Sequence, residues 1–190
     1  MLKISAIILC GGKSRRMGQD KGLMAINNQA MVSHVAKGLS GAQEILLNCN
    51  QHVEQYQALG FETFTDKEYG DIEANAGPLL GILSAMETAK HDWLLFSPCD
   101  TPDIPADYLK VMAQHASDQL AFACVVFDGQ RQQHLHVLLH KRYKESLMMY
   151  FLSGRRRTSE WLNSIKPIEV DFSQQAAAFT NLNALEDLPA

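Results

Sequence analysis

Short apolar runs alternate with longer amphipathic segments along this chain. The run 4–9 (ISAIIL) is apolar at almost every position and ends before two glycines, which is typical of a strand buried on both faces. Met31, Val35 and Leu39 instead recur at a helical spacing. A second helix is predicted from Pro78, which suits the first helical position, to about Lys90.

The same patterns predict the other elements. A turn is expected at Asn27-Asn28, and Asp128-Gly129 is expected to join two strands of an antiparallel insertion. Strands are predicted over 44–47, 61–65, 93–96, 121–127, 136–139, 168–172 and 179–183, a loop over 70–76, and helices over 53–59, from Pro105 onward and within 143–164.

Alternating strands and helices predict an α/β fold with a mostly parallel sheet, helices on both faces and a small antiparallel insertion. We expect one domain, 1–190, in which about 1–102 form a nucleotide-binding half and about 103–190 an acceptor-binding half. In such sheets ligands bind beyond the carboxyl ends of the strands, at the switch point of the strand order.

The composition excludes several classes of protein. The chain has 17 Lys and Arg against 21 Asp and Glu, a net charge of −4, which argues against general nucleic-acid binding. No apolar run approaches the roughly 18–20 residues of a membrane span, and no cleavage site follows the short apolar start, so a cytoplasmic protein is expected. The four cysteines contain no CxxC pair, which predicts neither a zinc knuckle nor a disulfide framework.

The segment 9–21 (LCGGKSRRMGQDK) is the strongest local signal. It is neither a Walker A loop, because Ile7 stands where that motif needs glycine, nor a GxGxxG fingerprint. Glycines let backbone N–H groups approach an anion, and Lys13, Arg15, Arg16 and Lys21 bring positive charge. The pattern predicts a polyphosphate site; a solvated basic turn is the alternative.

Polar residues follow three predicted strands. Asp100, in SPCDTP after the strand 93–96, would face the glycine-rich turn, and a carboxylate facing a triphosphate requires a divalent cation such as Mg²⁺. Asn48 and Asp66 follow two other strands and are candidates to bind a base or ribose. All three side chains could instead serve turns or helix caps.

The chain resembles the molybdenum cofactor guanylyltransferase family over almost its whole length. The matching motifs are LCGGKSRRMGQDK, the strand-end Asn48, GPLLGILSAM, SPCDTPDIP and FTNLNALEDL. The resemblance implies a Rossmann-like nucleotidyltransferase fold and transfer of GMP from GTP to molybdenum-bound molybdopterin, with release of pyrophosphate. Gly-Gly in LCGG and the residues CDTP favour the guanylyl branch over the related cytidylyltransferases.

The resemblance also implies roles for individual residues. Arg16, Lys21 and Asp100 would be catalytic, and Asp100 would bind Mg²⁺. The resemblance further implies that Asn181 and Asn183 lie near the pterin substrate or the metal, which makes them candidate acceptor-binding residues; His134 is a further candidate, from its place in the sequence, for contact with the acceptor. The implied GTP site comprises Leu9, Cys10, Gly11, Gly12, Lys21, Asn48, Asp66 and Asp100.

The implied partners are GTP, molybdenum-bound molybdopterin, and proteins that deliver or receive the cofactor through transient contacts. This sequence departs from the family pattern at Leu135, where proline is usual, and in the late motif, which lacks Thr-Pro. A CTP-dependent enzyme, a sugar- or alditol-phosphate nucleotidyltransferase, and an inactive GTP-binding regulatory protein are the alternatives.

Three other features have an ordinary and a functional interpretation. His134, His136 and His140 could share one strand face and bind zinc, but no fourth ligand lies nearby in sequence. The run 155–157 (RRR) is either a solvated helix face or a grip on a phosphate or a partner protein. Strand-end cysteines at 10, 49 and 99 are either small packing residues or a redox-sensitive cluster.

Overall fold

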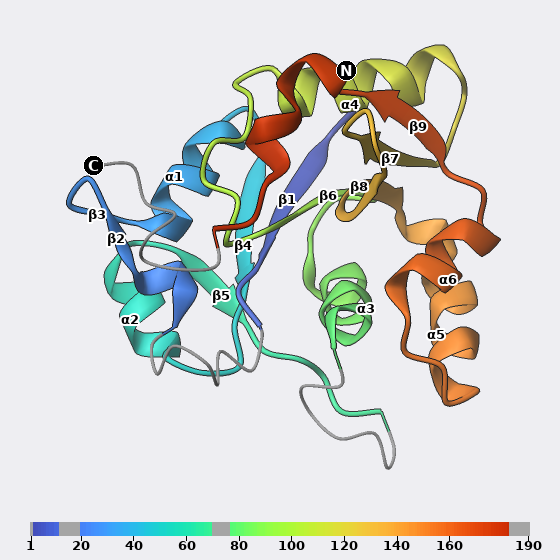
Figure 1. The fold of residues 1–190 in the computed structure, drawn as a ribbon. Coiled ribbons are helices and arrows are strands. Elements are labelled where there is room, and N and C mark those ends of the chain that lie inside the picture. Colours follow the sequence, from blue (N-terminus) through green and yellow to red (C-terminus); the bar gives the residue numbers. More distant parts are fainter. Residues whose placement is uncertain (1, 12–19, 70–76, 183–190) are drawn as a thin grey trace.

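A central sheet of seven strands, in the order β5-β4-β1-β6-β8-β7-β9, organises the molecule (Figure 1). The computed structural model describes residues 2–11, 20–69 and 77–182. The strands of this sheet are β1 (Ile4–Leu9), β4 (Glu44–Asn48), β5 (Glu62–Phe64), β6 (Trp93–Pro98), β7 (Ala123–Phe127), β8 (Gln132–His140) and β9 (Ile168–Asp171).

One strand breaks the parallel arrangement of the sheet. β1 pairs in parallel with β4 and β6, β4 with β5, and β7 with β9. β8 runs antiparallel to both β6 and β7. The predicted mostly parallel sheet with an antiparallel insertion is confirmed.

Helices cover both faces of the sheet (Figure 1). Neighbouring residues of β1 point to opposite faces: Ile8 belongs to one hydrophobic core and Ile7 to the other. The helices are α1 (Met31–Gly38), α2 (Val53–Ala58), α3 (Pro78–Thr88), α4 (Tyr108–Asp118), α5 (Lys144–Leu152) and α6 (Thr158–Ser164).

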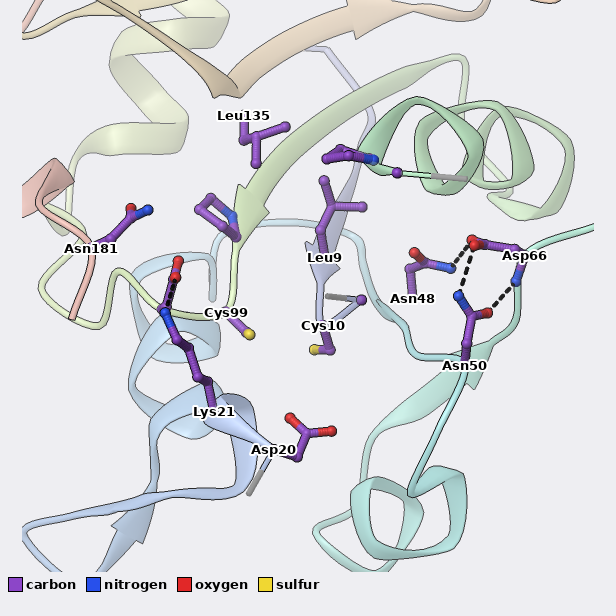
Figure 2. Close-up of a pocket in the computed structure, with 15 residues that line it drawn as sticks. Leu9, Cys10, Asp20, Lys21, Asn48, Asn50, Asp66, Cys99, Leu135 and Asn181 are labelled. Carbon is purple, nitrogen blue, oxygen red and sulfur yellow. Dashed lines mark hydrogen bonds and ion pairs between the residues drawn. The ribbon is translucent and has the colours of Figure 1, made fainter. Parts of the chain in front are cut away.

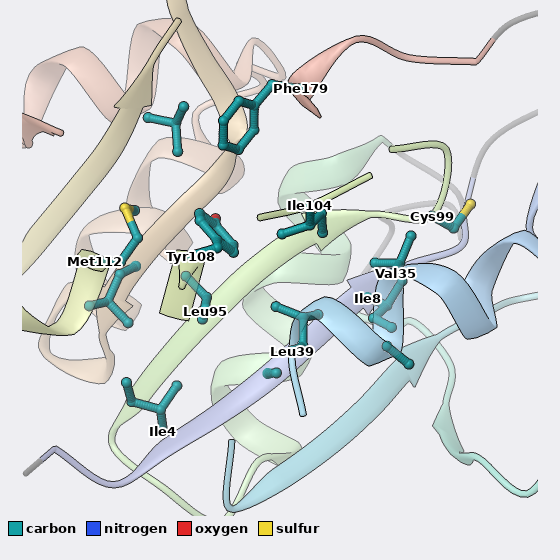
Figure 3. Packing of buried hydrophobic residues seen from close by; sticks show 14 of the residues in the cluster. Ile4, Ile8, Val35, Leu39, Leu95, Cys99, Ile104, Tyr108, Met112 and Phe179 are labelled. Carbon is teal, nitrogen blue, oxygen red and sulfur yellow. The ribbon is translucent and has the colours of Figure 1, made fainter. Parts of the chain in front are cut away.

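The two cores divide the helices between them. Val35 of α1, Tyr56 of α2 and Met112 of α4 pack in the same core as Ile8, part of which is drawn in Figure 3. The other core contains residues of α3, α5 and α6, including Leu83, Leu147 and Trp161. Burial on both faces explains why β1 is apolar at nearly every position.

The structure corrects several of the predicted elements, for example β8, which runs over Gln132–His140 where a strand over 136–139 was predicted. The segment 179–182 is not a strand: Phe179 ends a 3₁₀ helix, η3 (Ser173–Phe179), and Leu182 N donates to Asp100 O at 2.8 Å. The helix predicted from Pro105 begins at Tyr108. Ser97 and Pro98, which the prediction placed directly after the strand 93–96, are the last residues of β6.

A small hairpin forms at the predicted turn Asn27-Asn28. β2 (Ala25–Ile26) and β3 (Gln29–Ala30) pair in antiparallel fashion, and both asparagines have positive φ, 49° and 62°. Asparagine tolerates this region better than other non-glycine residues, which suits a two-residue hairpin. The predicted loop 70–76 lies outside the described residues.

The strand order changes direction beside β1. The chain passes from β1 to β4 and β5 on one side, and then returns to place β6 on the other side of β1. The carboxyl ends of β1 and β6 therefore form a switch point, the position where open α/β sheets bind ligands. In the described part of the chain, no helix has the length and apolarity required to span a bilayer.

Candidate active site

A cavity of about 360 Å³ opens at the carboxyl ends of β1 and β6 (Figure 2). Its described lining residues come from segments far apart in the sequence: Leu9, Cys10, Gly11, Asp20, Lys21, Asn48, Asn50, Asp66, Gly77, Pro78, Pro98, Cys99, Asp100, Leu135 and Asn181.

Most of the predicted site residues meet in this cavity. The sequence nominated eight of the lining residues: Leu9, Cys10, Gly11, Lys21, Asn48, Asp66, Asp100 and Asn181. Gly12, Arg16 and Asn183 lie outside the described residues. His134 is not among the described lining residues, whereas its neighbour Leu135 is.

An ion pair crosses one side of the cavity. Lys21 Nζ lies 3.1 Å from Asp100 Oδ2, and the two side chains are 22% and 15% exposed. Lys21 begins a short 3₁₀ helix, η1 (Lys21–Leu23), whereas Asp100 follows β6. Partial burial lowers the local dielectric, so the two charges attract each other more strongly than a pair on the surface. Both side chains keep some exposed area, so a bound anion could still reach the Lys21 ammonium.

Hydrogen bonds of its two neighbours hold the backbone around Asp100 at the end of the sheet. Cys99 N donates to Leu9 O at 3.1 Å, which extends the β1–β6 pairing beyond the strand. The Thr101 hydroxyl donates to Pro98 O at 3.2 Å and closes the following turn. These bonds hold the backbone on both sides of Asp100 beside the end of β1.

Two asparagines hold a carboxylate on the other side of the cavity. Asn48 Nδ2 donates to Asp66 Oδ1 at 3.0 Å, and Asn50 Nδ2 donates to Asp66 Oδ2 at 2.7 Å. Asp66 N donates in return to Asn50 Oδ1 at 2.8 Å. Figure 2 shows this cluster beside Leu9, at the end of β4. Amide and carboxylate groups of this kind suit hydrogen bonding to a base or a ribose.

The segment after η3 brings Asn181 to the cavity. Phe179 is buried against His136, with ring centroids 4.9 Å apart, and against Tyr108 and Phe172. Three residues after Phe179, a backbone hydrogen bond from Leu182 N to Asp100 O holds the chain beside the end of β6. Asn181 thus lies near Asp100 although 81 residues separate them in sequence.

An irregularity in β8 places Leu135 at the cavity. Val125 pairs with Val137, but the next residue, Val126, pairs with Gln133. His134, Leu135 and His136 therefore have no register partner on β7. Bulges near active sites commonly redirect a side chain, and here the apolar Leu135 becomes part of the lining.

Sequence reasoning missed several lining residues. Asn50 lies two positions after Asn48. Side chains two positions apart in a strand point to the same face, and extending this alternation past the end of the strand would have identified Asn50. Gly77, with a φ of 98°, and Pro78 bring the start of α3 to the cavity, a signal that was used only for helix prediction. Three more lining residues lie inside the two motifs, but only their neighbours were predicted to form the site: Asp20, Pro98 and Cys99.

The histidines of β8 occupy three different environments. His136 is buried, and burial lowers its pKa to about 3, so its imidazole is neutral. His140 packs edge-on against Trp93 and Phe122. Desolvation, and then the charge of Arg131, lower the pKa of His134. Within the described residues no group of three or more His, Cys, Asp or Glu is placed to hold a metal, so the zinc interpretation has no support.

Burial raises the pKa of two strand-end cysteines, Cys10 and Cys49, and so favours their thiol form. Burial, followed by the neighbouring Cys99, raises the pKa of Cys10 well above its ordinary value, and burial raises that of Cys49 to about 11. Because the thiolate is the reactive form, these groups favour the packing interpretation over the redox one.

The three arginines lie between α5 and α6 and contact side chains of these two helices. Arg155 lies 4.3 Å above the Tyr150 ring and Arg156 lies 4.0 Å above the Phe151 ring. Arg157 pairs with Glu160 at 3.1 Å. The run is solvent-exposed, as the ordinary interpretation expected, but it lies in the connection between two helices and not on a helix face.

The donor set at Asp100 suits magnesium. Mg²⁺ is usually held by one or two carboxylates together with phosphate oxygens and water, rather than by a complete protein cage. Asp100 supplies one partly exposed carboxylate within the cavity. A magnesium ion that arrives with a triphosphate would therefore find a suitable oxygen ligand here.

Comparison with known proteins identifies related chains. A family model described as the MobA-like NTP transferase domain matches residues 6–168. The chain is 38% identical over 192 residues to the molybdenum cofactor guanylyltransferase of Haemophilus influenzae, with 98% of this chain and 96% of that protein covered. It is 36% identical over 187 residues to the protein of the same name from Histophilus somni, covering 97% and 94%.

A solved structure has the same fold. Molybdopterin-guanine dinucleotide biosynthesis protein A from Archaeoglobus fulgidus superimposes with a TM-score of 0.76 at 18% identity, covering 96% of this chain and 94% of that one. The predicted Rossmann-like nucleotidyltransferase fold is confirmed.

Proposed function

The chain belongs to the MobA-like NTP transferase family, and we propose that it transfers GMP from GTP to molybdenum-bound molybdopterin, releasing pyrophosphate. Its family makes it a nucleotidyltransferase. The observation that carries the proposal is the Lys21–Asp100 pair inside the cavity at the switch point. This pair combines a cation for phosphate with a carboxylate for a metal ion.

GTP would lie along the cavity with its phosphates at Lys21. In this arrangement the ammonium of Lys21 neutralises charge on the α-phosphate and on the leaving pyrophosphate, a stabilisation that strengthens as negative charge develops. Arg16 would assist there. The base and ribose would lie toward Asn48 and Asp66, two side chains that are held in position by their mutual hydrogen bond.

Asp100 would hold Mg²⁺ against the phosphates. When bound, the ion supplies Lewis-acid stabilisation of the phosphate oxygens and relieves their repulsion from the carboxylate. The attacking phosphate of the acceptor is already anionic, so no general base is assigned. Positioning and charge neutralisation are then the chief contributions of the protein.

The acceptor would approach from the side that carries Asn181. We expect Asn183 and His134 to contribute to its binding, and Leu135 to form an apolar surface beside it. Proteins that deliver or receive the cofactor would make transient contacts with the enzyme during this step.

A two-part assay tests the proposal. Calorimetric titration compares GTP, CTP and ATP with and without Mg²⁺, and a coupled assay measures pyrophosphate release with molybdenum-loaded molybdopterin. We expect GTP to bind best, and pyrophosphate to be released only when GTP, Mg²⁺ and the acceptor are all present.

Each other outcome supports a different alternative. Preference for CTP would identify a cytidylyltransferase, and release with a sugar or alditol phosphate would identify another acceptor class. GTP binding without pyrophosphate release would support the regulatory alternative and contradict the proposed function.

A further inference from the structure

The Asp20 carboxylate has two candidate partners, the ammonium of Lys21 and the hydroxyl of Tyr56. Asp20 lines the cavity immediately before Lys21, so its carboxylate is close in sequence to the ammonium that pairs with Asp100. Figure 2 shows the side chains of Asp20 and Lys21 pointing in different directions. Something must hold the Asp20 carboxylate in this orientation, because an adjacent ammonium attracts it.

A buried tyrosine supplies the holding contact. The Tyr56 hydroxyl donates to Asp20 Oδ1 at 2.6 Å, and Gly22 N donates to the same oxygen at 3.1 Å. Tyr56 belongs to α2 and is completely buried in the hydrophobic core. A short hydrogen bond to a carboxylate from a rigid, buried donor is among the stronger protein hydrogen bonds.

The Tyr56 hydroxyl is a permanent donor. Burial, and then the neighbouring Cys10 and Asp20, raise its pKa above the ordinary value for tyrosine. The phenol therefore keeps its proton throughout the pH range in which proteins fold.

Gly22 allows the phenol to approach η1. A Cβ at this position would overlap with the Tyr56 hydroxyl oxygen. The short 3₁₀ helix that begins at Lys21 thus rests directly on Tyr56, with Asp20 as its cap.

We propose that Tyr56 is a positioning residue of the nucleotide site: its hydroxyl holds the Asp20 carboxylate away from Lys21, so that the Lys21 ammonium serves Asp100 and the triphosphate. This inference rests on the proposed function for the identity of the nucleotide. Without the hydroxyl, Asp20 competes for the ammonium and the phosphates lose part of their cation.

Tyr56→Phe tests the inference, because it removes the hydroxyl and keeps the ring. The matched control is Tyr108→Phe, which removes another buried hydroxyl, one that donates to Phe96 O at 3.2 Å. Calorimetry with Mg²⁺ measures Kd for GTP and for guanosine, which lacks phosphates. We expect Tyr56→Phe to weaken GTP binding about tenfold and to leave guanosine binding unchanged. Tyr108→Phe should change neither.

A second substitution tests the competition directly. In Tyr56→Phe/Asp20→Asn the competing negative charge is gone, so GTP affinity should return to within about threefold of the wild type. Asp20→Glu leaves the phenol intact but gives the carboxylate a longer reach toward Lys21, and should also weaken GTP binding. If Tyr56→Phe does not fold, Asp20→Glu provides the test of the competition for Lys21.

The opposing outcomes are distinct. Equal weakening of GTP and guanosine, no difference between the two tyrosine variants, or no recovery in the double variant would each overturn the role of Tyr56. If the wild type prefers CTP or ATP, the proposed function fails, and the same comparison is made with that nucleotide and its nucleoside. A wild type that binds no nucleoside triphosphate overturns both proposals.

Discussion

On one side of the cavity neutral amides hold a carboxylate, and on the other side an ammonium group does. We call the first side, formed by Asn48, Asn50 and Asp66, the amide wall, and the second, formed by Asp20, Lys21 and Asp100, the charged wall. Each Asp66 oxygen accepts a hydrogen bond from an asparagine. Asp100 instead pairs with Lys21 at 3.1 Å.

The difference separates two tasks. The amide wall is a connected network in which moving one group leaves others without their partners, and such networks favour a fixed arrangement. The charged wall contains an ion pair whose members can exchange partners when a phosphate and a metal ion arrive. Fixed groups suit selection of the nucleoside, whereas exchangeable charges suit chemistry on its phosphates.

Both walls depend on a glycine that makes room for an anchoring side chain. A Cβ at Gly81 in α3 would overlap with Asn48 Oδ1, just as a Cβ at Gly22 would overlap with the Tyr56 hydroxyl. A substitution at Gly81 or Gly22 can therefore disturb one wall without changing a residue that is proposed to contact the ligand.

The largest effect is expected from Asp100→Asn in the charged wall. The change removes the carboxylate proposed to hold Mg²⁺, and turnover should fall by about a thousandfold. Affinity for metal-free GTP should not fall, because a negative charge that repels the triphosphate is lost. Pyrophosphate release and calorimetry without Mg²⁺ measure the two quantities. Turnover near that of the wild type would contradict the assigned role of Asp100.

Gly81→Ala should damage the amide wall alone. The new methyl group displaces the Asn48 amide from Asp66, and GTP and guanosine binding should both weaken about tenfold. Alanine is the better helix former by about 1 kcal/mol, so the helix itself should not be destabilised by propensity. Thr88→Ala is the control, because Thr88 lies in the same helix and its hydroxyl donates only to Ser84 O within that helix. If Gly81→Ala weakened GTP binding but spared guanosine, the division of tasks between the walls would be wrong.

The last effect concerns stability rather than ligand binding and is expected at His136. Burial lowers the pKa of this imidazole to about 3 from an ordinary 6.5. Between these values the unfolded chain binds a proton that the folded chain does not, so stability falls as the pH drops from about 6.5 toward about 3. The contribution reaches at most about 1.4 kcal/mol per pH unit.

His136→Phe should remove this contribution and flatten the fall in stability below pH 6.5. Denaturant unfolding at pH 7 and pH 5 measures the free energy of unfolding for both proteins. A variant that loses as much stability as the wild type between these pH values would show that His136 is not the group responsible. GTP affinity at pH 7 should change little, since His136 is absent from the described cavity lining.

Much of the fold could be read from hydrophobic patterning. β1 has the predicted bounds because a strand buried on both faces must be apolar throughout, and its end is marked by glycine. The segment 179–182 was misread because an apolar residue near a chain end resembles an edge strand. Phe179 instead fills an aromatic cluster, and the backbone of Leu182 bonds to Asp100.

The candidate site was predicted unevenly for a similar reason. Asn48, Asp66 and Asp100 were found because parallel strands bring their carboxyl ends to one edge of a sheet. Leu135 was not chosen, because its position depends on the register change in β8, which no local pattern announces. Asp20 was passed over because its partner, Tyr56, lies 36 residues away.

The sequence by itself determined which chemical groups stand at the ends of the strands and how the apolar residues divide between two faces of a sheet. Those properties follow from local spacing and composition. Only the tertiary structure decided which carboxylate pairs with Lys21, which is held by amides and which is held by a buried phenol. Hydrogen bonds and ion pairs act over about 3 Å, so these choices depend on how separate segments pack. Lys21 and Asp100, 79 residues apart in the chain, become partners only when β6 is placed beside β1.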